Sequence, residues 1–439
     1  MIISSIDKVI ETLPPELLSQ MAKKTPRAFF DWKKNSAFRR TVRFAAKNSP
    51  FYRRKFKELG IDPLKIHSPE DLGDFYTTPI DIINNAEEFI CRHPEAVFES
   101  SGTTGRNKRV YFSQAELNDI GRYNAAGLHL GGITKADRLV NAFDFCIWIP
   151  GMVTQKAIEM SGFLGMAAGK IEPIEVYNRL ATYKFSIVLG EPTWLIKLTE
   201  IAEKQGSFPL KFLIGGGEEM PDAARPWMTK VWQGAKVRMV YATVESGGII
   251  AFEPFDACGT YHINENNFYF EIADPAEDGY GEVTFTTLNR LTMPLIRYRN
   301  RDISKIIEEP CPCGLPYRRM AKIRGRADEM VVASGGNLYP LMFENVLKDV
   351  PLVMTDWQII FKLRGIKEVL EFHVELKAPG TEEKTKEMIF DGIKEKYPDL
   401  WKNYMLGIFQ IEFVYHEPHT VRKNRKLIHL LDHRYIDRK

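Results

Sequence analysis

The spacing of apolar side chains divides the 439-residue chain into three regions. In residues 1 to about 90, large apolar side chains recur at helical intervals, which predicts a mostly helical entry segment. The aromatic residues expected to anchor these helices in a core are Phe29, Phe30, Trp32, Phe38, Phe51, Tyr52 and Phe56.

From about residue 96 to residue 300, short apolar runs alternate with stretches of helical periodicity. This alternation indicates α/β layers, with buried parallel strands and helices on both faces of the sheet. Strands are expected at residues 138–142, 186–189 and 212–214, and helices at residues 191–204 and 221–232. Two later segments, residues 267–272 and 282–287, alternate apolar and polar side chains near glycines, and predict an antiparallel, barrel-like part.

The C-terminal region has a pattern of its own, typical of a small α+β unit of the split β-α-β kind. Its expected elements are a strand at 330–333, a helix at 341–348, a hairpin at 357–363 and 369–376, a charged helix at 381–396 and a final strand at 408–415. We therefore expect an α/β protein with a large domain at residues 1–327 and a small, mobile domain at residues 328–439.

Composition narrows the class of protein. The chain is 44% hydrophobic and 27% charged, with a net charge of +3, as in an ordinary globular protein with no nucleic-acid or membrane partner. The N-terminus is charged and amphipathic, and no apolar run reaches the roughly 18 residues of a membrane span. Five cysteines, an odd number, argue against a disulfide framework, so the cytoplasm is the expected compartment.

The stretch from Ser100 to Arg109 is the strongest chemical signal. It places four hydroxyls and two glycines ahead of three cationic side chains. Glycines let the backbone approach an anion, hydroxyl and amide groups donate to phosphate oxygens, and cations neutralise charge. The spacing is not that of a Walker A loop. By itself the stretch fits a phosphate-binding loop and a surface turn about equally well.

Five motifs that occur in order along the chain favour the phosphate-binding loop over the surface turn. They are SSGTTGRNK, GGGEEMP, YATVESGG, LIRYRNRD, and IRGRADEM followed by GGNLYP. With them the chain resembles the adenylate-forming superfamily of acyl-CoA synthetases, luciferases and adenylation domains. GTYHI and CPCG make it most similar to the phenylacetate–CoA ligase-like branch. The resemblance is strong from about residue 95 to residue 345 and weaker beyond.

The resemblance implies a role for each motif residue. Glu245 would ligate Mg²⁺, and Asp328 would be the hinge between the domains. Gly217 and Glu218 would lie beside the adenine and Tyr241 against its face, with Asp302 on the ribose and Arg326 on the ribose or phosphates. The residues that would hold the ATP phosphates are Ser100, Ser101, Gly102, Thr103, Thr104, Gly105 and Lys108.

The sequence departs from the family pattern in three places. Val244 and Ala242 replace a threonine and a glycine before the acid, and Arg301 adds a cation before Asp302. The catalytic lysine of the family usually follows a glycine, which is missing here. The number of residues back from 431–434 favours Lys426 as this catalytic lysine, whereas the number forward from Thr420 favours Lys423. The alternative is that both lysines belong to a solvated basic tail without a catalytic role.

Two further sites follow from side-chain chemistry. Cys258, His262, Cys311 and Cys313 offer the donors of a tetrahedral, structural Zn²⁺ site, with unrelated thiols as the alternative. The resemblance also places the acid pocket near Gly215 and Ala242. The aromatic side chains expected to stack there on a flat acid, or else to pack in the core, are Phe143, Phe145 and Trp148.

The implied enzyme is an AMP-forming ligase. It would activate an aryl or arylacetic acid with ATP to an acyl-adenylate, release pyrophosphate, and transfer the acyl group to a thiol, with CoA as the default acceptor. The alternatives are transfer to a phosphopantetheinyl carrier protein, an amine or a protein partner, and a nucleotide-binding homologue that has lost catalysis. Whether the chain forms a homodimer stays open.

Overall fold

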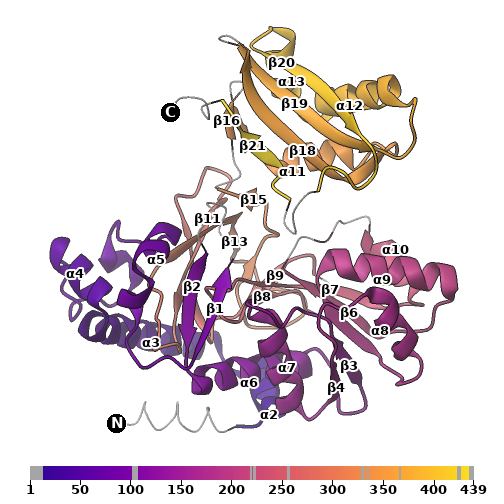
Figure 1. Ribbon diagram of the computed structural model, residues 1–439. Helices are drawn as coiled ribbons and strands as arrows, with labels where there is room; N and C mark the ends of the chain where they lie inside the picture. The colour runs from indigo at the N-terminus through magenta and orange to yellow at the C-terminus, as the bar shows by residue number, and fades with distance from the viewer. Residues whose placement is uncertain are drawn as a thin grey trace. The chain divides into compact units, whose positions relative to one another are not determined.

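The chain divides into two compact units in the computed structural model (Figure 1). The first comprises Met1–Asn300 with Lys305–Lys322, and the second Arg301–Ser304 with Ile323–Lys439. The structure describes residues 13–100, 107–217, 220, 224–254, 258–327, 331–333, 336–364, 367–422 and 427–434. Among these residues, no helix is both long and apolar enough to cross a bilayer.

The entry segment is helical, as predicted. Its helices are α2 (Pro15–Lys24), α3 (Arg27–Asn48), α4 (Pro50–Glu58), η1 (Pro69–Leu72), α5 (Pro79–Asn85) and η2 (Ala86–Phe89). Proline at the first turn and side-chain caps begin several of them; Thr78, for example, forms a capping box with Asp81 at the start of α5. Most of the predicted aromatic anchors are buried, but Trp32 is 42% exposed, so its assignment to the core was wrong.

The parallel part of the first unit is a run of strands β3 (Arg138–Asn141), β4 (Leu164–Ala167), β5 (Ile187–Gly190), β6 (Phe212–Gly216) and β7 (Lys236–Ala242). They pair in parallel in the order β4-β3-β5-β6-β7, which confirms the predicted α/β architecture. Its helices are α6 (Gln114–Leu130), α7 (Pro150–Ser161), α8 (Pro173–Leu180), α9 (Pro192–Gln205) and α10 (Ala224–Val231). Helices α6 and α7 cover one face and α8, α9 and α10 the other (Figure 1).

The same sheet continues beyond β7 with antiparallel strands. These are β8 (Ile249–Phe252), β9 (Tyr261–Ile263), β14 (Arg319–Met320) and β13 (Ile306–Ile307). A second sheet contains β10 (Phe268–Ala273), β11 (Gly281–Thr287) and β12 (Tyr298–Ser304), and the predicted antiparallel pairing of β10 with β11 is confirmed. A separate hairpin joins β1 (Ala96–Ser100) to β2 (Lys108–Phe112).

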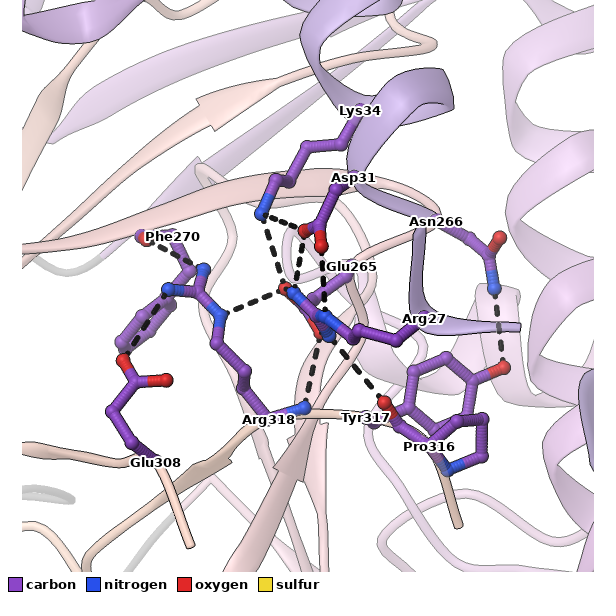
Figure 2. Close-up of polar contacts among 10 residues, drawn as sticks. All are labelled: Arg27, Asp31, Lys34, Glu265, Asn266, Phe270, Glu308, Pro316, Tyr317 and Arg318. Carbon is purple, nitrogen blue, oxygen red and sulfur yellow. Dashed lines mark hydrogen bonds and ion pairs between the residues drawn. The ribbon is translucent and has the colours of Figure 1, made fainter. Parts of the chain in front are cut away.

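A buried ion network holds α3 against the segments that carry β9 and β14 (Figure 2). The side chain of Glu265 is fully buried, and its oxygens accept hydrogen bonds from Arg27 at 2.8 Å, Arg318 at 2.9 Å and Lys34 at 3.3 Å. Asp31 bridges Arg27 and Lys34 from the helix side. Because all these groups are paired, the charges can be buried without leaving one uncompensated.

The second unit is an α+β sandwich. Its elements are β15 (Gly325–Arg326), β16 (Val331–Ala333), β17 (Gly336–Leu338), α11 (Pro340–Leu347), β18 (Val353–Arg364), β19 (Lys367–Leu376), α12 (Glu382–Lys396), α13 (Pro398–Met405), β20 (Phe409–His416) and β21 (Leu430–Asp432). The main sheet has the order β20-β19-β18-β21, and α11, α12 and α13 contribute to the core on one face. Residues 408–415 are therefore not the final strand: β21 follows and pairs in parallel with β18, and α13 was also missed.

The segment between β20 and β21 is attached to β18 near both of its ends. Arg422 forms a bidentate ion pair with Asp356, at 2.8 and 3.0 Å. His429 donates from Nδ1 to the carbonyl of Trp357 at 2.9 Å and packs on its ring at 4.2 Å between centroids. The two attachment points are thus neighbouring residues of one strand.

Candidate functional site

Glu245 is the centre of the candidate site in the first unit. It lies in the turn between β7 and β8 and is only 4% exposed. One carboxylate oxygen, Oε1, lies 2.7 Å from the ammonium nitrogen of Lys108, and accepts hydrogen bonds from Ser100 Oγ at 3.1 Å and Tyr298 Oη at 3.3 Å. Two segments far apart in sequence, the β1–β2 hairpin and β12, therefore converge on one oxygen atom of Glu245.

The surroundings of Glu245 keep its carboxyl group ionised. Burial alone would raise the pKa of Glu245, but the charge of Lys108 and the hydrogen bonds from Lys108 and Ser100 hold that pKa below its usual value. The backbone of the same residue is also fixed, because the buried Arg290 guanidinium donates to its carbonyl oxygen. A fixed, ionised carboxylate is the type of ligand that Mg²⁺ requires.

The β1–β2 hairpin positions the two ends of the hydroxyl- and glycine-rich stretch. In its register Ser100 lies opposite Lys108, so both residues that bracket the stretch point to Glu245. Several predicted site residues lie outside the part of the chain that the structure describes: Ser101, Gly102, Thr103, Thr104, Gly105, Glu218, Asp328, Lys423 and Lys426.

The residues expected near the adenine occupy the ends of neighbouring parallel strands. Gly217 directly follows β6 with φ at +86°, a conformation that favours glycine, and Tyr241 lies near the end of β7. The Tyr241 hydroxyl accepts a hydrogen bond from the side-chain amide of Asn300 on β12. Carboxyl ends of adjacent parallel strands are the usual place for a ligand in an open α/β sheet.

Asp302 and Arg326 form a pair in the second unit. They are direct partners in the β12–β15 register, and the guanidinium of Arg326 lies 2.9 Å from the Asp302 carboxylate. The structure thus brings together two residues that the sequence places on the same ligand. Asp302 is largely buried, and the ion pair with Arg326 offsets part of the cost of burying its carboxylate.

The predicted acid-pocket residues do not share one environment. Phe143 is buried in the core between α6, α7 and the parallel strands, whereas Phe145 is 41% exposed and Trp148 is half-buried. Gly215 lies inside the sheet, where an added Cβ would come within 2.6 Å of the Met239 sulfur. Ala242 ends β7, three residues before Glu245.

A small cavity is lined in part by Ser246, the residue after Glu245. It measures about 30 Å³, room for only one or two water molecules. Its polar lining includes Asp119 and Tyr123 of α6, Ser246 and Arg290. Burial raises the pKa of Asp119 and lowers that of Arg290 to about 10. These side chains come from three separate segments, α6, the turn after β7 and the segment around Arg290, and only Ser246 lies in one of the sequence motifs.

Three of the four predicted cysteine and histidine ligands form one close group, and Cys313 adjoins that group through His262. The donor atoms of Cys258, His262 and Cys311 all lie within 4.8 Å of one another. His262 Nε2 lies 3.9 Å from the Cys258 sulfur and 3.4 Å from the Cys313 sulfur. All five cysteines of the chain are free thiols. The spacing fits a tetrahedral zinc site, in which a sulfur and a nitrogen ligand are about 3.5 Å apart.

Known phenylacetate–coenzyme A ligases are similar to the chain over most of its length. No model of a known protein family matches the sequence. The chain is 27% identical over 404 residues to the phenylacetate–coenzyme A ligase of Thermus thermophilus, covering 88% of this chain and 87% of that protein. It is also 27% identical over 356 residues to the enzyme of the same name from Escherichia coli, with 77% and 80% covered.

Solved structures share the fold. 2-Hydroxyisobutyryl-CoA ligase in its postadenylation state superposes with a TM-score of 0.78 at 22% identity, covering 94% of this chain and 92% of that one. O-succinylbenzoate coenzyme A synthetase of Bacillus subtilis, in complex with ATP and a magnesium ion, gives 0.54 at 17% identity, with 72% and 66% covered. The chain is thus similar to phenylacetate–coenzyme A ligases over most of its length and shares its fold with acyl-CoA ligases of known structure.

Proposed function

We propose that this protein is an AMP-forming acid–CoA ligase. In the first step a carboxylate oxygen of the substrate attacks the α-phosphorus of ATP, the bond to the β-phosphate bridging oxygen breaks, and pyrophosphate leaves. In the second step the CoA sulfur attacks the carbonyl carbon and AMP leaves. The single observation that carries the proposal is the convergence of Lys108, Ser100 and Tyr298 on the buried Glu245.

The proposed chemistry requires positioning and charge neutralisation rather than a protein nucleophile. Lys108 and the hydroxyls and amides around residues 100–105 would hold the phosphates, and Glu245 would hold Mg²⁺, which neutralises the departing pyrophosphate. Binding of Mg²⁺ and ATP would replace the Lys108–Glu245 ion pair with contacts from each residue to the ligand. Support comes from a neighbour in the same superfamily whose structure contains ATP and a magnesium ion.

The acid is proposed to be aryl or arylacetic, because curated relatives are phenylacetate–CoA ligases. CoA is proposed as the acceptor for the same reason, with a carrier-protein thiol as the alternative. Both ATP and CoA are abundant in the cytoplasm, where we place the reaction.

A structural Zn²⁺ held by Cys258, His262, Cys311 and Cys313 is proposed as a clamp. The residues fit this ion because one imidazole nitrogen faces two sulfurs at distances close to those of a tetrahedral site. The ion would join the start of β9 to the segment that leads into β14. These strands already pair through His262 and Arg319, so the ion would reinforce an existing contact and take no part in the reaction.

Acid-dependent exchange of pyrophosphate into ATP tests the proposal directly. A panel should contain phenylacetate, benzoate, a short 2-hydroxy acid and a fatty acid. Exchange with at least one acid, followed by AMP release only when CoA is added, is the expected result. Exchange with AMP release that requires another thiol or an amine would identify a different acceptor. Absence of exchange with the whole panel, in protein that binds ATP, would favour a homologue without catalysis.

A further inference from the structure

Two imidazole rings meet on the sheet of the second unit, on the face opposite its core helices. His373 belongs to β19 and His416 is the last residue of β20. In the parallel register Glu375 lies opposite His416, so the two histidines are diagonal neighbours on the same face. Their nearest ring nitrogens, Nδ1 of His373 and Nε2 of His416, are 2.8 Å apart.

A carboxylate behind His373 fixes which nitrogen carries the proton. Glu371 Oε1 lies 2.7 Å from His373 Nε2, and the other oxygen of Glu371 accepts from Lys362 at 2.6 Å. The Nε2–H group therefore donates to the carboxylate, and Nδ1 presents its lone pair to His416. Metal-binding histidines are commonly oriented in this way, by a carboxylate on the ring nitrogen that does not touch the metal.

The spacing of the two nitrogens is close to that of ligands on one ion. With metal–nitrogen bonds of about 2.0–2.1 Å, two nitrogens are about 2.9 Å apart at a right angle and about 3.3 Å apart at the tetrahedral angle. The observed 2.8 Å is close to the first value, and in the free protein it is a hydrogen bond, which a bound ion would replace. The His373 side chain is 17% exposed, so water can reach the remaining positions.

We infer that His373 and His416 form a divalent transition-metal site, separate from the cysteine cluster and from the ATP site. Imidazole ligands favour Zn²⁺, Ni²⁺ or Cu²⁺ over Mg²⁺ or Ca²⁺. Two protein ligands with water in the other positions make this a weaker, exchangeable site than one with four protein ligands. A bound ion ties β20, an edge strand, to β19 next to it.

Nickel titration by calorimetry tests the site, using full-length protein first saturated with Zn²⁺ at the cysteine cluster and then dialysed. Wild type is expected to bind one equivalent of Ni²⁺, and His373→Ala and His416→Gln to lose it. Glu371→Ala should weaken binding by about 10- to 100-fold, because the ligand loses its orienting partner. His433→Ala, which removes an exposed histidine near the same sheet, is the matched control and should bind as wild type does.

Two control measurements exclude other causes of lost metal binding. Circular dichroism and acid-dependent exchange should stay unchanged in the histidine variants, which would show that the loss of bound Ni²⁺ is not caused by unfolding. The Ni²⁺ equivalent should persist in a Cys311→Ser variant, which removes a thiol ligand from the other cluster. Equal Ni²⁺ binding by wild type and the His373→Ala/His416→Gln double variant would overturn the inference and reduce the pair to a hydrogen bond.

Discussion

The ammonium group of Lys108 lies 2.7 Å from a carboxylate oxygen of Glu245, and both side chains are largely buried. This ion pair joins the hairpin that carries the hydroxyl-rich stretch to the turn after β7. A buried carboxylate without a partner is strongly destabilised, so the pair keeps Glu245 charged and in place before any ligand binds. The candidate site is in this sense already formed in the free protein.

Replacing Glu245 with glutamine should reduce acid-dependent ATP–pyrophosphate exchange by about 10²-fold or more, because the proposed Mg²⁺ ligand loses its charge. The melting temperature should also fall, because the largely buried Lys108 ammonium loses its counter-charge, so exchange is measured well below the melting transition. Glu99→Gln in β1, whose carboxylate accepts a hydrogen bond from Asn107 at 2.7 Å, is the matched control and should retain exchange. Full exchange in Glu245→Gln would remove Glu245 from the reaction.

Replacing Lys108 with methionine should raise the pKa of Glu245, because burial remains while the compensating charge is lost. The ionised carboxylate would then disappear at a higher pH as the solution is acidified. The acid limb of the pH–rate profile for exchange should therefore move to higher pH, whereas Lys108→Arg should keep it near the wild-type position. An unshifted acid limb in Lys108→Met would show that the limb reports another group.

The Glu265 network should contribute to stability in a pH-dependent way. Burial raises the pKa of Glu265, but Arg27, Arg318 and Lys34 outweigh that effect and lower it from 4.5 to about 2. A folded-state pKa below the unfolded value stabilises the protein above about pH 4.5, and this contribution falls away as the pH drops towards 2. The shift corresponds to about 3 kcal/mol.

Amide hydrogen exchange in α3 measures this contribution locally. Glu265→Gln should increase exchange in α3 at pH 7, and the difference from wild type should shrink on acidification. Glu88→Gln breaks the exposed pair with Arg54 and should cost less than about 1 kcal/mol. If the two variants have equal effects at pH 7, the buried network does not hold α3.

Protein purified without added metal should contain about one Zn²⁺ per chain by elemental analysis. Cys311→Ser and Cys313→Ser should lose the ion and melt at a lower temperature, because metal binding to the folded state adds to its stability. Cys91→Ser changes a thiol outside the cluster and should keep the metal content. A wild-type protein without zinc would refute the clamp.

Separate Lys423→Ala and Lys426→Ala variants should identify the catalytic lysine. The variant that lacks the charge-stabilising cation should lose about 10²-fold or more in adenylate formation. It should still transfer a pre-formed acyl-adenylate to CoA, since that step releases AMP without attack on phosphorus. If both variants keep full exchange, the basic segment is a solvated strip.

The sequence could predict the layered α/β architecture because buried parallel strands have a strong local signal: apolar runs such as residues 187–190 match no other element of that length. Weak local signals explain the misses. β21 has only three residues, beside a basic segment, and gains its pairing from β18. Trp32 lies in a helix whose apolar face is interrupted by charged residues, and no local pattern shows which side meets the core.

The contacts of the candidate sites and of the Glu265 network can likewise be divided into those that the local sequence predicts and those that it does not. Cys258 with His262 and Cys311 with Cys313 are close pairs in the chain, so their chemistry could be seen locally, and the β9–β14 pairing brings the pairs together. The contacts of Tyr298 with Glu245 and of Glu265 with Arg27 depend on segments far apart in sequence. Such contacts form only in the assembled fold, and no periodic pattern of residues in the sequence predicts them.

The attachment of Arg422 to Asp356 and of His429 to Trp357 has a consequence for catalysis. Arg422 and His429 fasten the chain to neighbouring residues of β18, one on each side of the sequence that contains both candidate lysines. If one of these lysines serves adenylation, it would be carried by the second unit, and motion of that domain would set when the charge-stabilising cation reaches and leaves the substrate.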